Sequence, residues 1–188
     1  MNHKLSVLIS KQLIKLGAVP QEQKDIYVYG LELIFSFLFC VTTIFAVSLF
    51  VHKTIEALVF MVLFVLIRQF TGGLHANTYL KCQLYTIGGY LSVAFLSSKL
   101  LPSFALHAIL IMVGIVIIIA IGPIESEKKP LTPQDRARNK KIGVALFGSA
   151  GIGGIATVSV HPAISSTIFY SLSLIIILMI IPYMERRE

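Results

Sequence analysis

A cysteine and a histidine seven residues apart are the side chains of this sequence best suited to covalent chemistry. His75 and Cys82 lie in a short, polar, glycine-rich stretch between two long apolar segments. A thiol activated by a neighbouring imidazole can attack a carbonyl carbon and form a thioester, as cysteine hydrolases and acyl-transfer enzymes do. One Cys and one His in a loop more often have a structural role, so the pair alone is a weak signal.

The spacing of this pair sets a condition on the backbone. On one straight helix, residues seven positions apart are separated by about 10.5 Å of rise, which far exceeds the about 3 Å needed for proton transfer. If His75 and Cys82 cooperate, the chain must therefore break between them. Gly72 and Gly73 favour irregular backbone, and Asn77 or Thr78 can cap a new helix. Cys82 would then lie in the first two turns of that helix, where the dipole favours negative charge.

The composition predicts a membrane protein. The chain has 188 residues, of which 56% are hydrophobic and 13% charged, whereas soluble domains have about 25% charged residues. Several apolar runs approach or exceed the about 18 residues that suggest a membrane span. We expect an all-α, polytopic fold with six transmembrane helices, at about residues 29–51, 54–67, 86–101, 104–121, 142–160 and 163–182.

The N-terminal segment predicts an amphipathic interfacial helix over residues 3–16, ended by Gly17 and Pro20. A helix packed on the bundle fits the pattern equally well. One face carries leucine and isoleucine and another carries lysine: Leu5, Leu8, Ile9, Leu13 and Leu16 against Lys4, Lys11 and Lys15. We expect one membrane domain over residues 1–188, comprising an amphipathic segment 1–28, a catalytic cytoplasmic loop 68–85 and a basic cytoplasmic loop 122–141.

The basic charge sets the orientation. Of the 16 Lys and Arg residues, all but Lys53 and Lys99 fall on one side if six spans begin with the N-terminus inside. Cytoplasmic loops accumulate Lys and Arg, so we expect both termini and the loop with Cys82 to be cytoplasmic, where thiols stay reduced. The net charge of +7 therefore needs no nucleic-acid partner, and no aromatic-basic module accompanies it.

Several neighbours of the pair are candidates for supporting roles. Asn77 could orient the imidazole or simply cap a helix, and Gln69 or the amides of Gly72 and Gly73 could stabilise an oxyanion. Arg68 either extends toward lipid headgroups or binds a substrate carboxylate.

Other parts of the chain are less informative about chemistry. Glu32 is a weaker candidate near the start of the first span, and Cys40 is expected to be a packing residue. The glycines of the fifth span predict close helix packing or a dimer contact. The sequence has no H-E-x-x-H, C-x-x-C, Walker or G-x-S-x-G motif, so we expect no metal and no cofactor.

The polar stretch resembles the signature of the accessory gene regulator B family, which are membrane cysteine peptidases that process quorum-sensing propeptides. The signature has an Arg, a Gly-Gly pair, a His, an Ala-Asn pair and a Cys, here Arg68, Gly72, Gly73, His75, Ala76, Asn77 and Cys82. A second similarity is Gly122-Pro123-Ile124-Glu125 followed by Lys129-Pro130-Leu131. Together with chain length and span number, the resemblance extends over essentially the whole chain.

The resemblance implies an endopeptidase of the bacterial cell membrane that removes the C-terminal tail of a short amphipathic propeptide. Cys82 would hold the peptide as a thioester, His75 would transfer the proton, and cyclisation would give a thiolactone or lactone. It also implies contact with membrane lipids and a homodimer. The competing interpretations are a small transporter that exports the peptide, which should carry charges near the bilayer centre, and a non-catalytic membrane scaffold.

Overall fold

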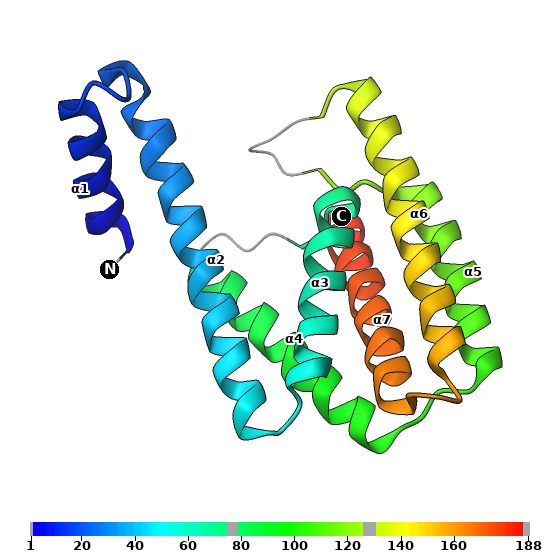
Figure 1. The fold of residues 1–188 in the computed structure, drawn as a ribbon. Coiled ribbons are helices and arrows are strands. Elements are labelled where there is room, and N and C mark those ends of the chain that lie inside the picture. The colour runs from blue at the N-terminus through cyan, green and yellow to red at the C-terminus, as the bar shows by residue number, and fades with distance from the viewer. Residues whose placement is uncertain (1, 75–78, 126–130, 186–188) are drawn as a thin grey trace. The chain divides into compact units, whose positions relative to one another are not determined.

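The computed structural model describes residues 2–74, 79–125 and 131–185. Within these ranges the chain is helical, with seven α-helices, one short 3-10 helix and no strand. The helices are α1 (Asn2–Lys15), η1 (Gln21–Gln23), α2 (Lys24–Phe50), α3 (Thr54–Thr71), α4 (Tyr79–Lys99), α5 (Phe104–Ile121), α6 (Pro133–Thr157) and α7 (Pro162–Glu185) (Figure 1). The all-α prediction is therefore confirmed for the described residues.

Helices α2 to α7 lie at the six predicted spans. Within the described ranges, four stretches are long and apolar enough to cross a membrane: Gln21–Phe50, Thr54–Thr71, Phe104–Ile121 and Pro162–Met184. Helix α6 instead begins with mostly polar and charged residues over 134–141, and α4 carries Lys81, Gln83 and several hydroxyl side chains. Membrane crossing by α4 and α6, and hence the count of six, stays a prediction.

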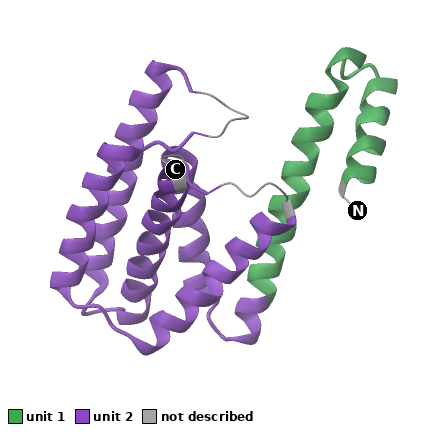
Figure 2. Ribbon diagram, turned by 180° about the vertical axis from the view of Figure 1, so that it is seen from behind, with its two compact units in different colours: residues 1–46 green, residues 47–188 purple. Residues whose placement is uncertain are grey.

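The chain divides into two compact units, residues 1–46 and residues 47–188 (Figure 2). In the first unit α1 ends at Lys15, one residue before the end that the sequence predicts, and Gly17 adopts a φ of +70°. Ser6 and Ser10 of α1 are buried, whereas Leu5 and Leu8 are exposed. This pattern leaves apolar side chains available for lipid, although a position at the membrane surface stays a prediction.

The second unit is built around α7. This helix packs against α3, α4, α5 and α6 (Figure 1), and half of its most apolar window is buried, more than in the other three candidate spans. The core includes Phe60 and Ile67 of α3, Tyr90 of α4 and Phe147 of α6. Large apolar side chains elsewhere on these helices face outward, as expected of a protein whose solvent is lipid.

The glycines of α6 allow close helix packing at some positions and not at others. A methyl group at Gly151 would lie 2.3 Å from the Ile111 side chain of α5, and one at Gly154 would lie 3.1 Å from the His107 ring. Gly148 makes only an ordinary contact, and Gly153 has no atom within 4 Å of such a methyl group. The packing interpretation therefore holds for Gly151 and Gly154.

Candidate active site

The backbone leaves helical geometry just before the candidate histidine, in a segment that we call the glycine strap (residues 71–74). Helix α3 ends at Thr71, and the Gly72 N–H donates to the Arg68 carbonyl oxygen at 2.9 Å, which closes the last turn. Gly72 and Gly73 have φ values of +71° and +139°, which side chains other than glycine rarely adopt. Glycine is thus required for the turn that the sequence predicts.

The strap is fixed to the segment that follows α5. The Ile124 N–H donates to the Thr71 carbonyl oxygen at 2.9 Å, and Gly72 and Ile124 form an isolated parallel bridge. The two backbones are so close that a methyl group at Gly72 would lie 2.0 Å from the Ile124 carbonyl oxygen. Gly143 of α6 packs against the Thr71 side chain on another side, where a methyl group would lie 3.0 Å from it. Thr71 and Gly72, in the first stretch that carries the resemblance, therefore contact Ile124 of the second.

The far end of the strap is fixed to α7. The Leu74 N–H donates to the carbonyl oxygen of Leu178 at 2.8 Å. Gly73 lies against the same carbonyl group, with 3.1 Å between that oxygen and a methyl group built on its backbone. Since His75 follows Leu74 directly in the chain, this contact sets where the backbone begins its path to the histidine.

Arg68 braces the strap from within α3. Its Nη2 donates to the Leu74 carbonyl oxygen, and its guanidinium lies over the Phe64 ring, 5.0 Å from the centroid. Arg68 also lies near enough to the Cys82 side chain for an electrostatic interaction between the two. These contacts give Arg68 a bracing role that the sequence did not suggest, while snorkelling and binding of a substrate carboxylate stay predictions.

Cys82 lies in the first turn of α4, four residues into the helix, and is half-buried. This position confirms the expectation that Cys82 lies in the first two turns of a new helix. Thr86 Oγ1 donates to the Cys82 carbonyl oxygen at 3.0 Å, an ordinary bond to the preceding turn. Neither Cys82 nor Cys40 is in a disulfide.

The predicted break is present as far as the structure describes it. The chain is non-helical at Gly73 and Leu74 and helical again from Tyr79. His75 and Asn77 lie outside the described residues, so the distance from His75 to Cys82 and the role of Asn77 stay predictions.

The remaining sequence candidates are placed as follows. Gln69 is exposed at the end of α3. The Gly72 N–H already donates to the backbone carbonyl oxygen of Arg68. Of the two glycine amides proposed to stabilise the oxyanion, that of Gly73 is therefore the better candidate. Glu32 Oε1 lies 2.6 Å from His3 Nδ1 and joins α1 to α2.

A buried polar cluster surrounds His107, and it was not predicted from the sequence. His107 Nδ1 donates to the Ser103 carbonyl oxygen at 3.1 Å, and its Nε2 lies 3.1 Å from Ser165 Oγ. Ser165 Oγ donates to the Gly154 carbonyl oxygen at 2.7 Å, so the cluster joins α5, α6 and α7. The signal available in the sequence was His107 itself, a basic residue within an apolar helix, together with the glycines of the neighbouring helix α6.

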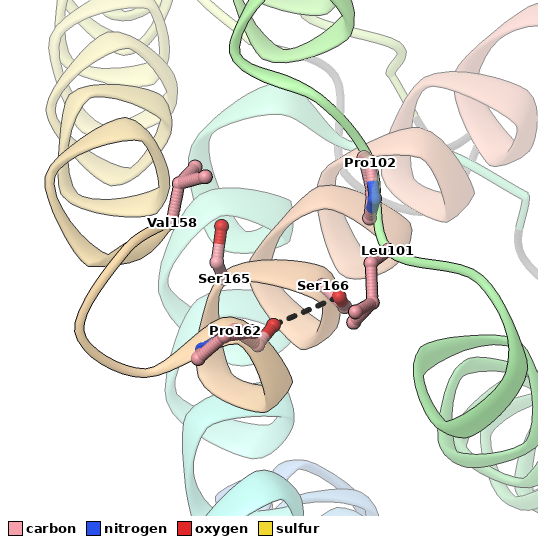
Figure 3. Close-up of a pocket in the computed structure, with 6 residues that line it drawn as sticks. All are labelled: Leu101, Pro102, Val158, Pro162, Ser165 and Ser166. Atoms are coloured by element: carbon pink, nitrogen blue, oxygen red, sulfur yellow. Dashed lines mark hydrogen bonds between the residues drawn. The ribbon is translucent and has the colours of Figure 1, made fainter.

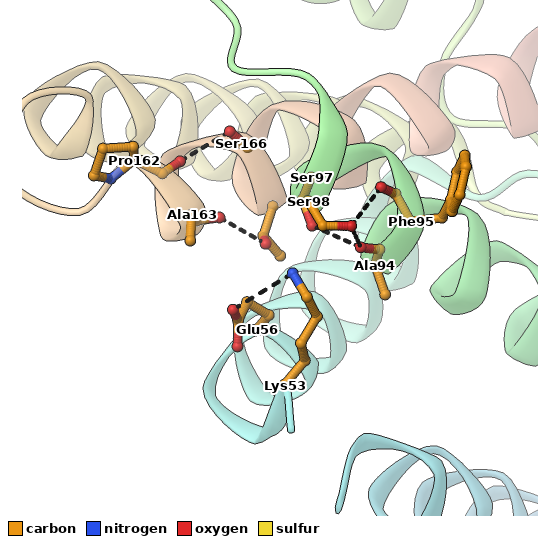
Figure 4. Close-up of polar contacts among 10 residues, drawn as sticks. Lys53, Glu56, Ala94, Phe95, Ser97, Ser98, Pro162, Ala163 and Ser166 are labelled. Carbon is orange, nitrogen blue, oxygen red and sulfur yellow. Dashed lines mark hydrogen bonds and ion pairs between the residues drawn. The ribbon is translucent and has the colours of Figure 1, made fainter. Parts of the chain in front are cut away.

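This cluster lies far from the strap. Ser165 also lines a cavity of about 210 Å³ with Leu101, Pro102, Val158, Pro162 and Ser166 (Figure 3). Polar contacts continue at the same end of the unit, where Lys53 Nζ lies 3.8 Å from Glu56 Oε1 (Figure 4). Twelve residues separate Ser166 from Leu178, which is about 18 Å along an α-helix. We therefore assign the cluster a structural role.

Metal ligation has no support in the part of the chain that the structure describes, where no group of three or more His, Cys, Asp or Glu residues is placed to hold an ion.

The described residues form a helical protein with four stretches long and apolar enough to span a membrane, and with a cysteine near the start of the helix that follows the glycine strap. A family model described as Accessory gene regulator B matches residues 3–184. The chain belongs to the accessory gene regulator B family, and so to the accessory gene regulator system of quorum sensing.

Individual relatives agree with this assignment. The chain is 25% identical over 150 residues to an AgrB-like protein of Clostridium perfringens, covering 76% of this chain and 70% of that protein. It is 28% identical over 140 residues to the accessory gene regulator protein B of Staphylococcus epidermidis, covering 74% of this chain and 63% of that protein. The corresponding protein of Staphylococcus saprophyticus is 27% identical over 113 residues, covering 60% and 59%. No solved structure matches the chain.

Proposed function

We propose that this chain is a membrane cysteine endopeptidase that cleaves the C-terminal tail from a short quorum-sensing propeptide. The observation that carries the proposal is the position of Cys82 in the first turn of α4, the helix that follows the arginine-braced strap along the chain, in a member of the accessory gene regulator B family. The strap fixes the backbone at Leu74, the residue before His75, and Cys82 lies near the start of a separate helix. Both features suit a nucleophile and a base supplied by two different segments.

The reaction has two acyl transfers. Cys82 Sγ attacks the scissile carbonyl carbon, the carbon–nitrogen bond breaks, and a thioester forms. His75 takes the thiol proton and gives it to the leaving amine. A thiol or hydroxyl within the peptide then attacks the thioester carbonyl carbon, and the carbon–sulfur bond to Cys82 breaks. His75 transfers the proton of the attacking group to the Cys82 sulfur, and a thiolactone or lactone ring is closed. Exclusion of water favours ring closure over hydrolysis.

The proposed arrangement in the cell follows from charge. The excess of Lys and Arg on one side of the spans favours a multi-pass protein of the bacterial cell membrane with both termini and the active site in the cytoplasm. The proposed partners are the amphipathic propeptide, membrane lipids and a second copy of the chain, and the chain is proposed to act as one membrane peptidase domain.

Cleavage in a defined membrane tests the proposal. The protein in lipid nanodiscs is mixed with a candidate propeptide, and the products are followed by mass spectrometry. Cys82→Ala and His75→Ala should abolish cleavage, whereas the matched control Cys40→Ala should cleave at the wild-type rate. An acyl adduct on Cys82 should be trapped in the wild type. Full cleavage by Cys82→Ala would refute the proposal.

Orientation has its own test. In the Cys40→Ala background Cys82 is the remaining thiol, so a thiol reagent that cannot cross membranes should label inverted vesicles and not intact cells. Labelling of intact cells would contradict the cytoplasmic site.

A further inference from the structure

Helix α7 contains a proline, Pro182, in its last turn. Proline has no N–H, so in an α-helix the carbonyl group four residues earlier loses its donor. In α7 this carbonyl belongs to Leu178. Because this part of α7 lies within a stretch apolar enough to span a membrane, a carbonyl group without a donor would be costly, and prolines in such helices are tolerated where neighbours supply one.

The glycine strap supplies that donor. The Leu74 N–H is 2.8 Å from the Leu178 carbonyl oxygen. Gly73 permits the approach, since its φ of +139° and its close contact with the same carbonyl group both disfavour a side chain. At the other end the strap is fixed by Ile124, whose N–H binds Thr71. The strap is therefore held by backbone hydrogen bonds to two separate parts of the fold.

We propose that Pro182 is a positioning residue for the reaction. By removing one helical donor it makes the Leu178 carbonyl oxygen available to Leu74, and this hydrogen bond fixes the backbone from which His75 follows. The inference rests on the proposed peptidase function and deepens it. Proton transfer requires heavy atoms within about 3 Å, and a displacement of about 1 Å can lower a rate about 100-fold.

Restoring the missing N–H tests the proposal. In Pro182→Ala the new N–H can bond to Leu178 within the helix and compete with Leu74. We expect kcat for propeptide cleavage to fall about fivefold to tenfold, the effect of weakening one hydrogen bond, while KM stays within about twofold. Thermal stability should be unchanged or higher, because alanine is the better helix former. A structural defect would instead lower activity and stability together.

The matched control is Pro162→Ala at the start of the same helix. A proline in the first turn removes an N–H that has no helical acceptor, so this variant should keep the wild-type kcat. Replacing Leu74 by its α-hydroxy analogue deletes the N–H donor and keeps the side chain. This change should lower kcat in the wild type and have a smaller effect in Pro182→Ala, because the two changes act on one bond.

Hydrogen exchange separates this proposal from the peptidase function. The Leu74 amide should be protected in the wild type and in Pro162→Ala, and should exchange at least about tenfold faster in Pro182→Ala. An unchanged exchange rate, an unchanged kcat, or a kcat loss matched by a loss of stability would overturn the inference. Failure of the wild type to cleave would refute the proposed function, while the exchange at Leu74, which needs no substrate, would still test the hydrogen bond.

Discussion

The tightest contact of the candidate site is the approach of Gly72 to Ile124, and Gly72→Ala is the sharpest test of it. The added methyl group would lie 2.0 Å from the Ile124 carbonyl oxygen, 2.9 Å from its carbonyl carbon and 3.0 Å from its nitrogen. All three are backbone atoms, so no side-chain rotation relieves the overlap. Gly72 also has φ +71° and ψ −152°, a combination open almost solely to glycine.

The two effects give the size of the loss. Holding a residue other than glycine in this region costs about 1–3 kcal/mol, and forcing a methyl group into a packed site costs about 1–3 kcal/mol more. The variant can avoid part of this cost only by moving the strap away from Ile124. We therefore expect Gly72→Ala to lose about 2–6 kcal/mol of stability if the strap stays, or at least about 100-fold in kcat if it moves.

Thermal unfolding and propeptide cleavage in nanodiscs measure the two outcomes. The matched control is Gly88→Ala in α4, where no atom lies within 4 Å of the added methyl group. This control should be as active as the wild type and up to about 1 kcal/mol more stable. Gly72→Ala with the wild-type unfolding temperature and a kcat within about twofold of the wild type would refute the reasoning about the strap.

Three further predictions follow from other contacts. Arg68→Lys should lower kcat about tenfold, because an ammonium group cannot both donate to the Leu74 carbonyl oxygen and stack on the Phe64 ring. Cleavage kinetics measure this, and KM should be unchanged. Gly154→Ala should lose about 1–3 kcal/mol of stability by crowding the His107 ring, whereas Gly153→Ala should lose none; thermal unfolding of the pair decides. His107→Ala should lose about 2–4 kcal/mol through the cavity and the lost hydrogen bonds and leave the kcat of the folded protein unchanged, and a selective loss of kcat would contradict its structural assignment.

The helices were predictable because their apolar runs are long and are separated by glycine, proline or short polar links. The second predicted span stops at residue 67, whereas α3 continues to Thr71. Polar Arg68 and Gln69 suggest an end, but the helix continues until the glycines remove the preference for helical φ. The break before Cys82 followed from helix geometry alone, since one straight helix could not bring the pair together.

The partners of the strap were not predictable from side-chain chemistry. Ile124 and Leu178 are apolar residues, and they contribute through their backbone N–H and carbonyl groups. Periodicity and charge describe side chains and therefore give no information about such contacts. The number of membrane spans was also not fully predictable from the sequence. The polar side chains of α4 and α6 are compatible either with crossing the membrane or with packing at its surface.

A site held by backbone hydrogen bonds is indicated in the sequence mainly by residues that lack an atom, namely glycine without its Cβ and proline without its N–H. Any residue except proline can donate at position 124 and any residue can accept at position 178, so the identities of Ile124 and Leu178 reveal little. Gly72 is required because it lacks the Cβ that would strike Ile124. Pro182 has an effect because it lacks the N–H that would bond to Leu178. This explains why two glycines precede the histidine in the signature, and why a proline far along the chain belongs to the same proposed site.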